Sequence, residues 1–373
     1  MSDTYGTNLN RKFATSVLKI FYEKSVADMI CNRDYEGEIK GVATKVDVLT
    51  FQAQAWQSYT GAALTATDIY EVACQLHTDQ QKAYYVKIKS IDQLKSWVKD
   101  PQGTIVEQLG NQLKQDVDAF VLAKYADVAA GNRVGTDYTT GTVTITAVSG
   151  AVVGDGTTFT SAMVGRGFKA AGHSVWYRVK SQSSGTAIVI EDDKDDVTSA
   201  YTGGAINAGA TYTIEAATVL ECNSNGGSSK TKIVGLVASL KGKLDKALVP
   251  DDGNRWLVIP SDVEIALINA DQLNKSIDGV YRDLIGRGFI GELFGFKIFR
   301  TEQVSGNNTD GYRVLAGHTA WQTFAEALVE NGEEPWLAGD FGKAVKGLVV
   351  YGSKIADERR KCAAEAFIKI VSE

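Results

Sequence analysis

One long stretch of the chain, from residue 104 to about residue 131, repeats apolar positions every three or four residues. The stripe consists of Ile105, Leu109, Leu113, Val117, Phe120, Val121, Tyr125 and Val128. This spacing predicts an amphipathic α-helix, and Thr104 and Glu107, just after Pro101, have the spacing of a capping box at its start. At the standard rise such a helix is roughly 40 Å long. Its apolar stripe therefore needs another long element to cover it.

Two stretches before this helix alternate apolar and polar residues, which is typical of half-buried strands. They are Val42–Val48 and Ile69–Leu76, and the segment that joins them carries Phe51, Trp56 and Tyr59. The pattern predicts a long hairpin with an aromatic tip. Because an isolated two-stranded ribbon is only marginally stable in water, we expect these three aromatic side chains to contact a surface, preferably that of another subunit.

Residues 138–216 differ in composition from the rest of the chain. Only 12 of these 79 residues are charged and 24 are Thr or Gly, a bias that favours short strands and turns. The predicted strands are Thr142–Val148, Val175–Val179, Ala187–Ile190 and Thr211–Ile214. We predict a small all-β sandwich or barrel that is inserted into the host fold. Residues 223–229, rich in Ser, Asn and Gly, would be the flexible return.

The chain after residue 255 predicts an α+β module in the order strand, helix, strand, strand, helix, strand. The two helix starts are the capping boxes Ser261–Glu264, after the strand Trp256–Ile259, and Thr319–Gln322, after the strand Tyr312–Leu315. The closing strands are Val345–Tyr351 and Ala366–Val371.

Charge and composition exclude several classes of protein. The net charge of −6 is spread evenly along the 373 residues, so the chain lacks the basic cluster that sequence-specific nucleic-acid binding requires. No run approaches the roughly 20 apolar residues of a membrane span, and the first residues lack the apolar middle of a signal peptide. We expect synthesis in the cytoplasm and no membrane partner. The four scattered cysteines have no CxxC spacing, so buried thiols are expected.

Motifs for catalysis or cofactor binding are weak. Gly286–Gly291 has the GxGxxG spacing, but a charged segment precedes it and a strand-like one follows, which is the wrong context for a dinucleotide site. Asp192–Asp196 lacks calcium-loop spacing and is expected to be a solvated turn. The three histidines are far apart and match no metal motif. The sequence therefore predicts no catalytic, cofactor-binding or metal-binding residue, and no enzyme.

The order of these features resembles the major capsid proteins of tailed bacteriophages of the Hong Kong 97 type. The likeness rests on this layout together with Trp256–Ser261, Gly288–Phe296 and Val349–Gly352. Separately, the predicted insert resembles a β module of phage virion proteins through Gly141–Thr146, Val153–Phe159 and Met163–Arg166. The resemblance implies an α+β capsid fold with an N-terminal arm, an extended β-hairpin loop, a spine helix, axial and peripheral domains, and an all-β insertion domain.

The resemblance also implies a division of the chain. The N-terminal arm would be 1–35, the extended loop, peripheral domain and spine helix 36–137, the insertion domain 138–216, and the axial domain with the returning strands 217–373. The segment from Asn274 to Phe289 would approach the axis of a capsomer. Arg282, Asp283 and Arg287 on it would form inter-subunit salt bridges, although solvated surface charges are an equally good interpretation.

The function that the resemblance implies is assembly. Copies would form pentamers and hexamers that close into the icosahedral head shell, which encloses packaged double-stranded DNA without sequence specificity. Portal, scaffolding or decoration proteins would be further partners, and the mature location would be the virion. The alternatives are an encapsulin-like nanocompartment shell, a tail or baseplate protein, and an enzyme of unrecognised class.

Overall fold

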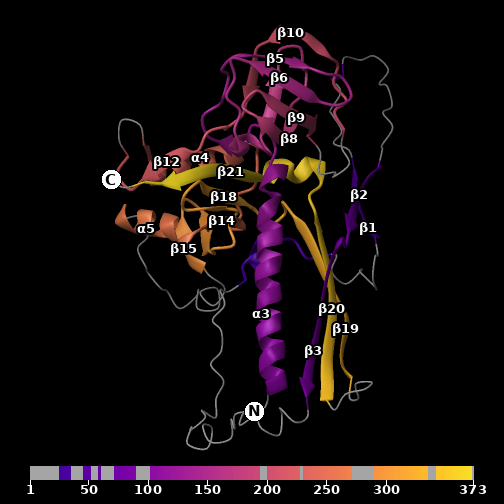
Figure 1. The fold of residues 1–373 in the computed structure, drawn as a ribbon. Helices are drawn as coiled ribbons and strands as arrows, with labels where there is room; N and C mark the ends of the chain where they lie inside the picture. Colours follow the sequence, from indigo (N-terminus) through magenta and orange to yellow (C-terminus); the bar gives the residue numbers. More distant parts are fainter. Residues whose placement is uncertain are drawn as a thin grey trace, which may run out of the picture.

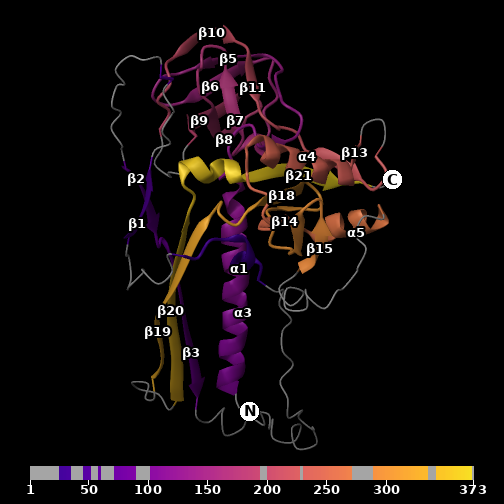
Figure 2. The same ribbon diagram turned by 180° about the vertical axis from the view of Figure 1, so that it is seen from behind.

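The chain is a mixed α+β protein whose sheets lie along one side and at one end of a long helix (Figures 1 and 2). The computed structural model describes residues 25–34, 45–51, 58–59, 71–89, 101–193, 200–226, 230–270, 289–334 and 342–371. A seven-stranded sheet lies at one end of the molecule. A nine-stranded sheet, here the central sheet, lies next to it, and a three-stranded sheet, here the long sheet, extends away from both.

The long helix is α3, Pro101–Leu122, about 33 Å long at the standard rise. It continues into the 3₁₀ helix η2, Ala123–Asp127. The predicted helix is confirmed, but its α-helical part begins at Pro101 and ends at Leu122, short of residue 131. Val117 and Val121 of the predicted stripe are buried, as is Leu122, and they pack with the short helix α1, Ala27–Ile30, in the main core.

The long sheet runs alongside α3 in both views (Figures 1 and 2). Its strands are β3 (Gln80–Lys89), β19 (Thr323–Glu334) and β20 (Gly342–Lys354), in the antiparallel order β19-β20-β3. Phe120 of α3 meets Tyr351 of β20 edge to face, with ring centroids 5.4 Å apart. Aromatic contacts of this kind add to the burial of apolar area.

The predicted hairpin is confirmed as a two-stranded ribbon. Its strands β1 (Lys45–Phe51) and β2 (Glu71–His77) pair antiparallel, from Lys45 opposite His77 to Phe51 opposite Glu71. The base of the ribbon packs on the long sheet, where Leu76 and Ala325 are fully buried together.

The central sheet has the strand order β13-β12-β21-β18-β14-β16-β15, with β17 beside β18 and β4 beside β21. The strands are β4 (Arg133–Val134), β12 (Leu220–Asn223), β13 (Thr231–Lys232), β14 (Arg255–Ile259), β15 (Phe289–Leu293), β16 (Phe296–Arg300), β17 (Gly306–Asn307), β18 (Gly311–His318) and β21 (Ala363–Ile370). Strand β14 illustrates how both faces of the central sheet are buried. Trp256 and Val258 point into the core shared with α3, while Leu257 and Ile259 point into a second core, as the alternation of a strand requires.

The second core is covered by helices α4 (Ile233–Lys246) and α5 (Ser261–Asn269). Helix α4 was not predicted, although Ile233, Leu236, Val237, Leu240 and Leu244 have helical spacing and are all buried. Helix α5 was predicted at Ser261, but its capping box does not form. Ser261 instead donates its backbone N–H, at 2.9 Å, and its hydroxyl to Glu302, and Glu264 pairs with Arg300 at 3.1 Å.

The seven-stranded sheet has the antiparallel order β10-β5-β6-β9-β8-β7-β11. Its strands are β5 (Thr142–Ile145), β6 (Ala151–Asp155), β7 (Gly167–Ala170), β8 (Tyr177–Ser184), β9 (Ala187–Asp192), β10 (Ile206–Ala210) and β11 (Tyr212–Ile214), and the 3₁₀ helix η3 (Ser161–Met163) lies between β6 and β7. The four predicted strands are present. Strands β6, β7 and β10 were not predicted.

Two predictions from local patterns are wrong. Thr319–Gln322 does not start a helix, because the chain turns there into β19, where Phe324 and Ala325 are buried on opposite faces of the strand. Asp192 and Asp193 are not in a solvated turn. Asp192 is 9% exposed and accepts the hydroxyl of Thr202 at 2.9 Å, and Asp193 accepts a hydrogen bond from Arg360, in the 3₁₀ helix η5 (Asp357–Cys362), at 2.6 Å.

Buried ion pairs join the seven-stranded sheet to the central sheet. Glu365 of β21 is fully buried, and its two oxygens accept hydrogen bonds from Arg166, which directly precedes β7, and from Arg313 of β18 at 3.3 Å. Arg313 also lies 4.0 Å from the ring centroid of Phe367. Burial alone would raise the pKa of Glu365, but Arg166, Arg313 and Arg133 lower it below its ordinary value.

A second group of ion pairs lies at the end of α3. Arg178 of β8 donates to Asp127 at 2.6 Å and to Glu191 at 3.0 Å, and all three side chains are nearly buried. Burial would lower the pKa of Arg178, but the two carboxylates and Asp193 raise it. The seven-stranded sheet is therefore held by charged groups at several places.

Replacement of Glu365 tests this junction. In Glu365→Gln, two buried guanidinium groups lose their charge partner, so we expect the free energy of unfolding to fall by about 3–5 kcal/mol. Urea denaturation of the subunit measures the change. The matched control is Glu358→Gln on the exposed part of η5, which should change stability by less than about 0.5 kcal/mol. Equal stabilities for the two variants would contradict the account.

Candidate assembly surfaces

The structure locates only part of the predicted contact residues. Tyr59 is 73% exposed, and Phe51 is the last residue of β1. Trp56 on the ribbon and Arg282, Asp283 and Arg287 in the predicted axial segment lie outside the described residues. Of the six predicted contact residues, the structure therefore describes only Phe51 and Tyr59.

The ribbon approaches the long sheet very closely at its base. A Cβ atom added to Gly352 of β20 would lie 1.9 Å from the carbonyl oxygen of His77 at the end of β2, so only glycine fits there. Its base is thus fixed on its own subunit, whereas Tyr59 between its two strands is exposed to solvent.

The first described residues are fixed to α3 by Asp118. Its carboxylate accepts hydrogen bonds from the backbone N–H groups of Val26, at 3.0 Å, and Ala27, at 2.9 Å, and from the hydroxyl of Ser25 at 2.8 Å. Asp118 is 1% exposed. Burial raises its pKa to about 6, although these hydrogen bonds oppose the shift. The ionised form is therefore held in place at a desolvation cost.

The same segment then crosses to the long sheet. The backbone N–H of Asn32 donates to the carbonyl of Gln322, and the N–H of Phe324 donates to the carbonyl of Asn32, both at 2.9 Å. Arg33 lies 3.5 Å from Glu326 of β19 and 5.2 Å from the centroid of the Phe324 ring. Residues 25–34 thus bridge α3 and the long sheet near the main core.

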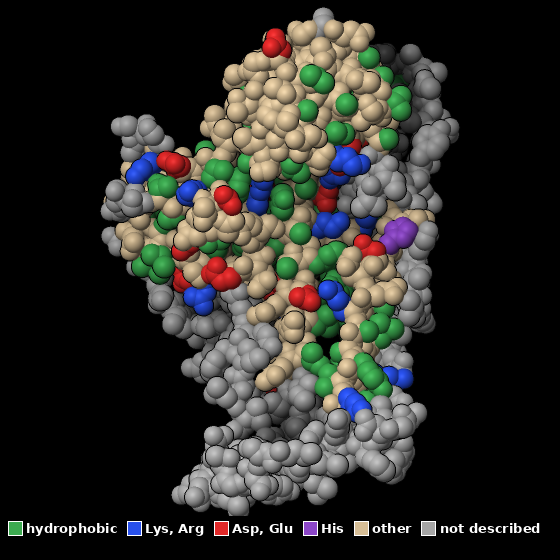
Figure 3. All heavy atoms as spheres, viewed as in Figure 1, with side chains coloured by type: hydrophobic (Ala, Val, Ile, Leu, Met, Phe, Trp, Pro, Cys, Tyr) green, Lys and Arg blue, Asp and Glu red, His purple; other side chains and the backbone are tan. Residues whose placement is uncertain are grey.

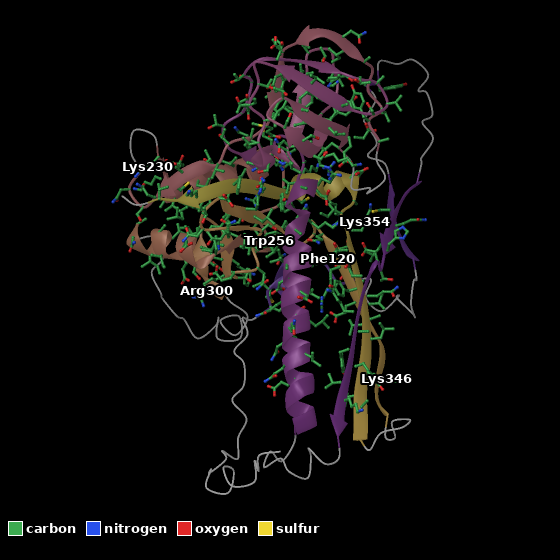
Figure 4. All side chains as sticks on the ribbon, in the orientation of Figure 1. Phe120, Lys230, Trp256, Arg300, Lys346 and Lys354 are labelled. Carbon is green, nitrogen blue, oxygen red and sulfur yellow. The ribbon has the colours of Figure 1, made fainter. Side chains whose placement is uncertain are left out.

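Below this bridge, a groove of about 520 Å³ separates α3 from the long sheet. Its apolar lining includes Leu109, Leu113 and Val117 of α3, Tyr84 of β3 and Val349 of β20. Figure 3 shows apolar side chains on this part of the surface. In Figure 4, Phe120 marks the closed upper end, where α3 contacts the sheet, and Lys346 marks the lower half of β20. A groove of this size and character is typical of a binding surface.

Charged residues form the rim of the groove. Lys82 of β3 and Asp116 of α3 lie 3.6 Å apart across it, and each is about half exposed. Such an exposed pair contributes little to stability. This pair therefore adds little to the attachment of the lower half of α3 to the long sheet.

Sequence reasoning missed Asp118 as an anchor and Glu365 as a junction residue. The signal for Asp118 is its position, three residues before Val121 and hence on the buried face of α3. Glu365 is a lone acidic residue in an apolar strand, which indicates a buried, paired charge. Their partners, however, are up to 199 residues away in sequence.

Within the described ranges, no three His, Cys, Asp or Glu side chains converge in a way that could hold a metal ion. None of the described helices combines the length and apolar character that crossing a membrane requires. The exposed surfaces and the groove are thus the candidate functional features.

No family model matches the sequence, and the comparison with curated proteins finds no match. Solved structures are similar over nearly the whole chain. A chain of Mycobacterium phage Che8 has a TM-score of 0.56 and 16% identity, covering 97% of this chain and 98% of the other. A chain in the capsid structure of cyanophage P-SCSP1u has a TM-score of 0.53 and 15% identity, covering 98% of this chain and 94% of the other.

A third neighbour comes from the capsid asymmetric unit of cyanophage Pam1. Its TM-score is 0.53 at 11% identity, and both chains are covered completely. The order and arrangement of elements are thus shared from end to end, without close sequence similarity. The chain has the fold of phage capsid proteins.

Proposed function

We propose that this chain is a phage major capsid protein, whose copies form pentamers and hexamers that close into an icosahedral head shell around double-stranded DNA. The observation that carries the proposal is the extent of the structural likeness. It covers 94–100% of the phage chains named above and 97–100% of this one. The role is assembly rather than catalysis.

In this proposal the architecture is of the Hong Kong 97 type. The length of α3 supports its assignment as the spine helix, and the ribbon β1–β2 supports an extended loop. Residues 1–35 would be the N-terminal arm, held at Ser25–Ala27 by Asp118. The seven-stranded sheet would form the insertion domain, 138–216, and the central sheet with α4 and α5 would contribute the axial domain.

The driving force for assembly would be the burial of surfaces that one subunit leaves exposed. The groove beside α3 offers apolar area, and Tyr59 offers an exposed aromatic ring. Permanent assemblies bury roughly 2,000–5,000 Å² per interface. Many moderate contacts to several neighbours then act together, because each contact raises the effective concentration of the next.

The proposed partners follow from a shell that encloses a genome. Copies of the chain are the main partner, and portal, scaffolding or decoration proteins would join them. The even spread of a net charge of −6 supports packaged DNA that is enclosed without adhering to the shell wall, because binding to phosphates, whether specific or not, needs clustered positive charge. The mature location would be the virion, after synthesis in the host cytoplasm.

Electron microscopy of the expressed chain tests the proposal. We expect closed shells, alone or with a co-expressed scaffolding protein. Tubes would favour the tail alternative, and small discrete rings would favour a baseplate component. A subunit that remains monomeric at high concentration with scaffold present would overturn the proposal.

Loss of the exposed ring at Tyr59 should weaken assembly without harming the subunit. Because this side chain is 73% exposed, Tyr59→Ser should change unfolding stability by less than about 0.5 kcal/mol. An interface aromatic contributes about 2 kcal/mol when it is a central contact, so the yield of shells in sedimentation should fall sharply. Tyr59→Phe keeps the ring and serves as the control. Normal shell yield from the Ser variant would refute this contact.

Asp118, which anchors residues 25–27 to α3, should make the stability of the folded subunit depend on pH. Since the folded pKa of Asp118 is raised to about 6 from 3.8, the folded state takes up a proton that the unfolded chain releases. Protonation of Asp118 therefore stabilises the folded state most at low pH, and this stabilisation is lost as the pH rises through 6. Relative to Asp118→Asn, the wild type should gain about 2 kcal/mol in unfolding free energy between pH 7 and pH 4.

Urea denaturation of unassembled subunits, repeated across this pH range, measures the difference. The Asn side chain keeps an acceptor for the N–H groups of Val26 and Ala27 but cannot ionise. Parallel pH profiles for the wild type and the variant would show that Asp118 does not titrate as described.

A further inference from the structure

We propose that the junction between the seven-stranded sheet and the central sheet binds one halide ion, held between the guanidinium groups of Arg133 and Arg166. In ordinary solutions this ion would be chloride. The inference concerns the single subunit, so it goes beyond the proposed function and does not depend on it.

The backbone places three arginines around one glutamate. Strands β4 and β18 flank β21 of the central sheet, and Arg133 of β4 is paired with Glu365 of β21. Arg313 of β18 comes two residues before Leu315, which is also paired with Glu365, so Arg313 lies on the same face of the sheet. Arg166 reaches this face from the seven-stranded sheet and donates to Glu365.

All four charged side chains are buried. Arg133 is 3% exposed, Arg166 1%, Arg313 6% and Glu365 0%. Because little water screens them, the guanidinium groups repel one another more strongly than they would at the surface. Burial, followed by the charge of Arg166, lowers the pKa of Arg133 to about 10 and also lowers the pKa of Arg313. The three positive charges are therefore close enough to destabilise one another.

The positive charges in this cluster outnumber the negative ones. Glu365 balances one of the three guanidinium groups. The next carboxylate is Glu215, 7% exposed, which accepts the backbone N–H of Gly131 at 2.7 Å. The charge of Arg133 lowers the pKa of Glu215, although burial raises it more. Even with Glu215 ionised, one buried positive charge is left unbalanced.

The other charges at the junction do not supply the missing anion, because they are matched among themselves. Asp193 pairs with Arg360, and Asp127 and Glu191 both pair with Arg178. Lys124 and Lys180 add further positive charge beside Asp127 and Glu191.

Unused hydrogen-bond donors indicate where an anion would bind. Arg133 donates from Nη2 to the carbonyl oxygens of Ala126, at 2.9 Å, and Val128, at 3.0 Å, and Arg166 donates from Nη1 to Glu365. Nη1 of Arg133 and both Nε and Nη2 of Arg166 are buried and have no hydrogen-bond partner in the described part of the chain. Buried donors without an acceptor are rare and costly. One acceptor between the two side chains would satisfy both.

The charge and the number of donors select the class of ligand. A water molecule would accept these hydrogen bonds but would leave the excess charge buried without a counter-ion, which is costly. Phosphate and sulfate carry several strong acceptor oxygens and up to two charges, more than three N–H groups and one excess positive charge can match. A halide ion is small, carries one charge and accepts hydrogen bonds from any direction.

Urea denaturation of unassembled full-length subunits tests the proposal. We compare sodium chloride with sodium gluconate at the same ionic strength, so that screening is equal and only chloride is small enough for the junction. When chloride is present at about ten times its dissociation constant, we expect the equilibrium constant for unfolding to be about tenfold lower than in gluconate.

Two variants assign the effect to the junction. Arg133→Met removes the unbalanced charge together with an unused donor, so its stability should be the same in the two salts. Arg300→Met is the matched control, because Arg300 is half exposed, pairs with Glu264 and lies away from the junction (Figure 4). This control should keep the full chloride dependence. Each comparison is made between salts within one variant, so a general loss of stability does not imitate the result.

Bromide gives a second measurement that needs no variant. In crystals of the wild-type subunit grown in sodium bromide, we expect an anomalous scattering peak between Arg133 and Arg166. Bromide peaks at the surface with none at the junction would overturn the inference. Equal unfolding constants of the wild type in chloride and gluconate would do so too, as would an unchanged chloride dependence in Arg133→Met.

Discussion

One apolar core fixes the arrangement of the whole subunit. It lies where α1, the upper half of α3, strands β14, β16 and β18 of the central sheet, and strands β19 and β20 of the long sheet meet. Trp256 and Trp321, each 1% exposed, pack at its centre with ring centroids 5.9 Å apart. Large aromatic side chains contribute most of the burial in such a core. Because the core covers only the upper half of α3, the helix and the long sheet separate below it and leave the groove.

Buried ion pairs fix the orientation of the seven-stranded sheet on the central sheet, which apolar burial alone would leave undetermined. A flat apolar junction between the seven-stranded sheet and the central sheet would permit several orientations, whereas Glu365 requires Arg166 and Arg313 at set positions. Buried ion pairs add little net stability, since desolvation offsets much of the attraction, but losing one partner is costly. We interpret the junction as a device that gives the seven-stranded sheet one orientation. The proposed shell of many identical copies would need such uniformity.

Periodicity over long stretches predicted the fold well, and short motifs predicted it poorly. The stripe of α3 and the alternation of the ribbon strands gave elements that the structure contains. The capping-box pattern at Thr319–Gln322 failed because burial of Trp321 and Phe324 outweighs local helix signals. Helix α4 was missed although its apolar spacing is regular. The junction could not be derived from local patterns, because Arg166 and Glu365 meet only after the sheets have formed.

The central claim is that the lower half of the subunit and its ribbon are completed only by other copies. Amide hydrogen exchange tests this directly, because it reports the protection of each strand and helix. Compared with dissociated subunits, assembled shells should show much slower exchange in β3, in the lower half of α3 and in the ribbon, with little change in β14 and α4. Full protection of β3 and the ribbon already in the isolated subunit, unchanged on assembly, would contradict the account.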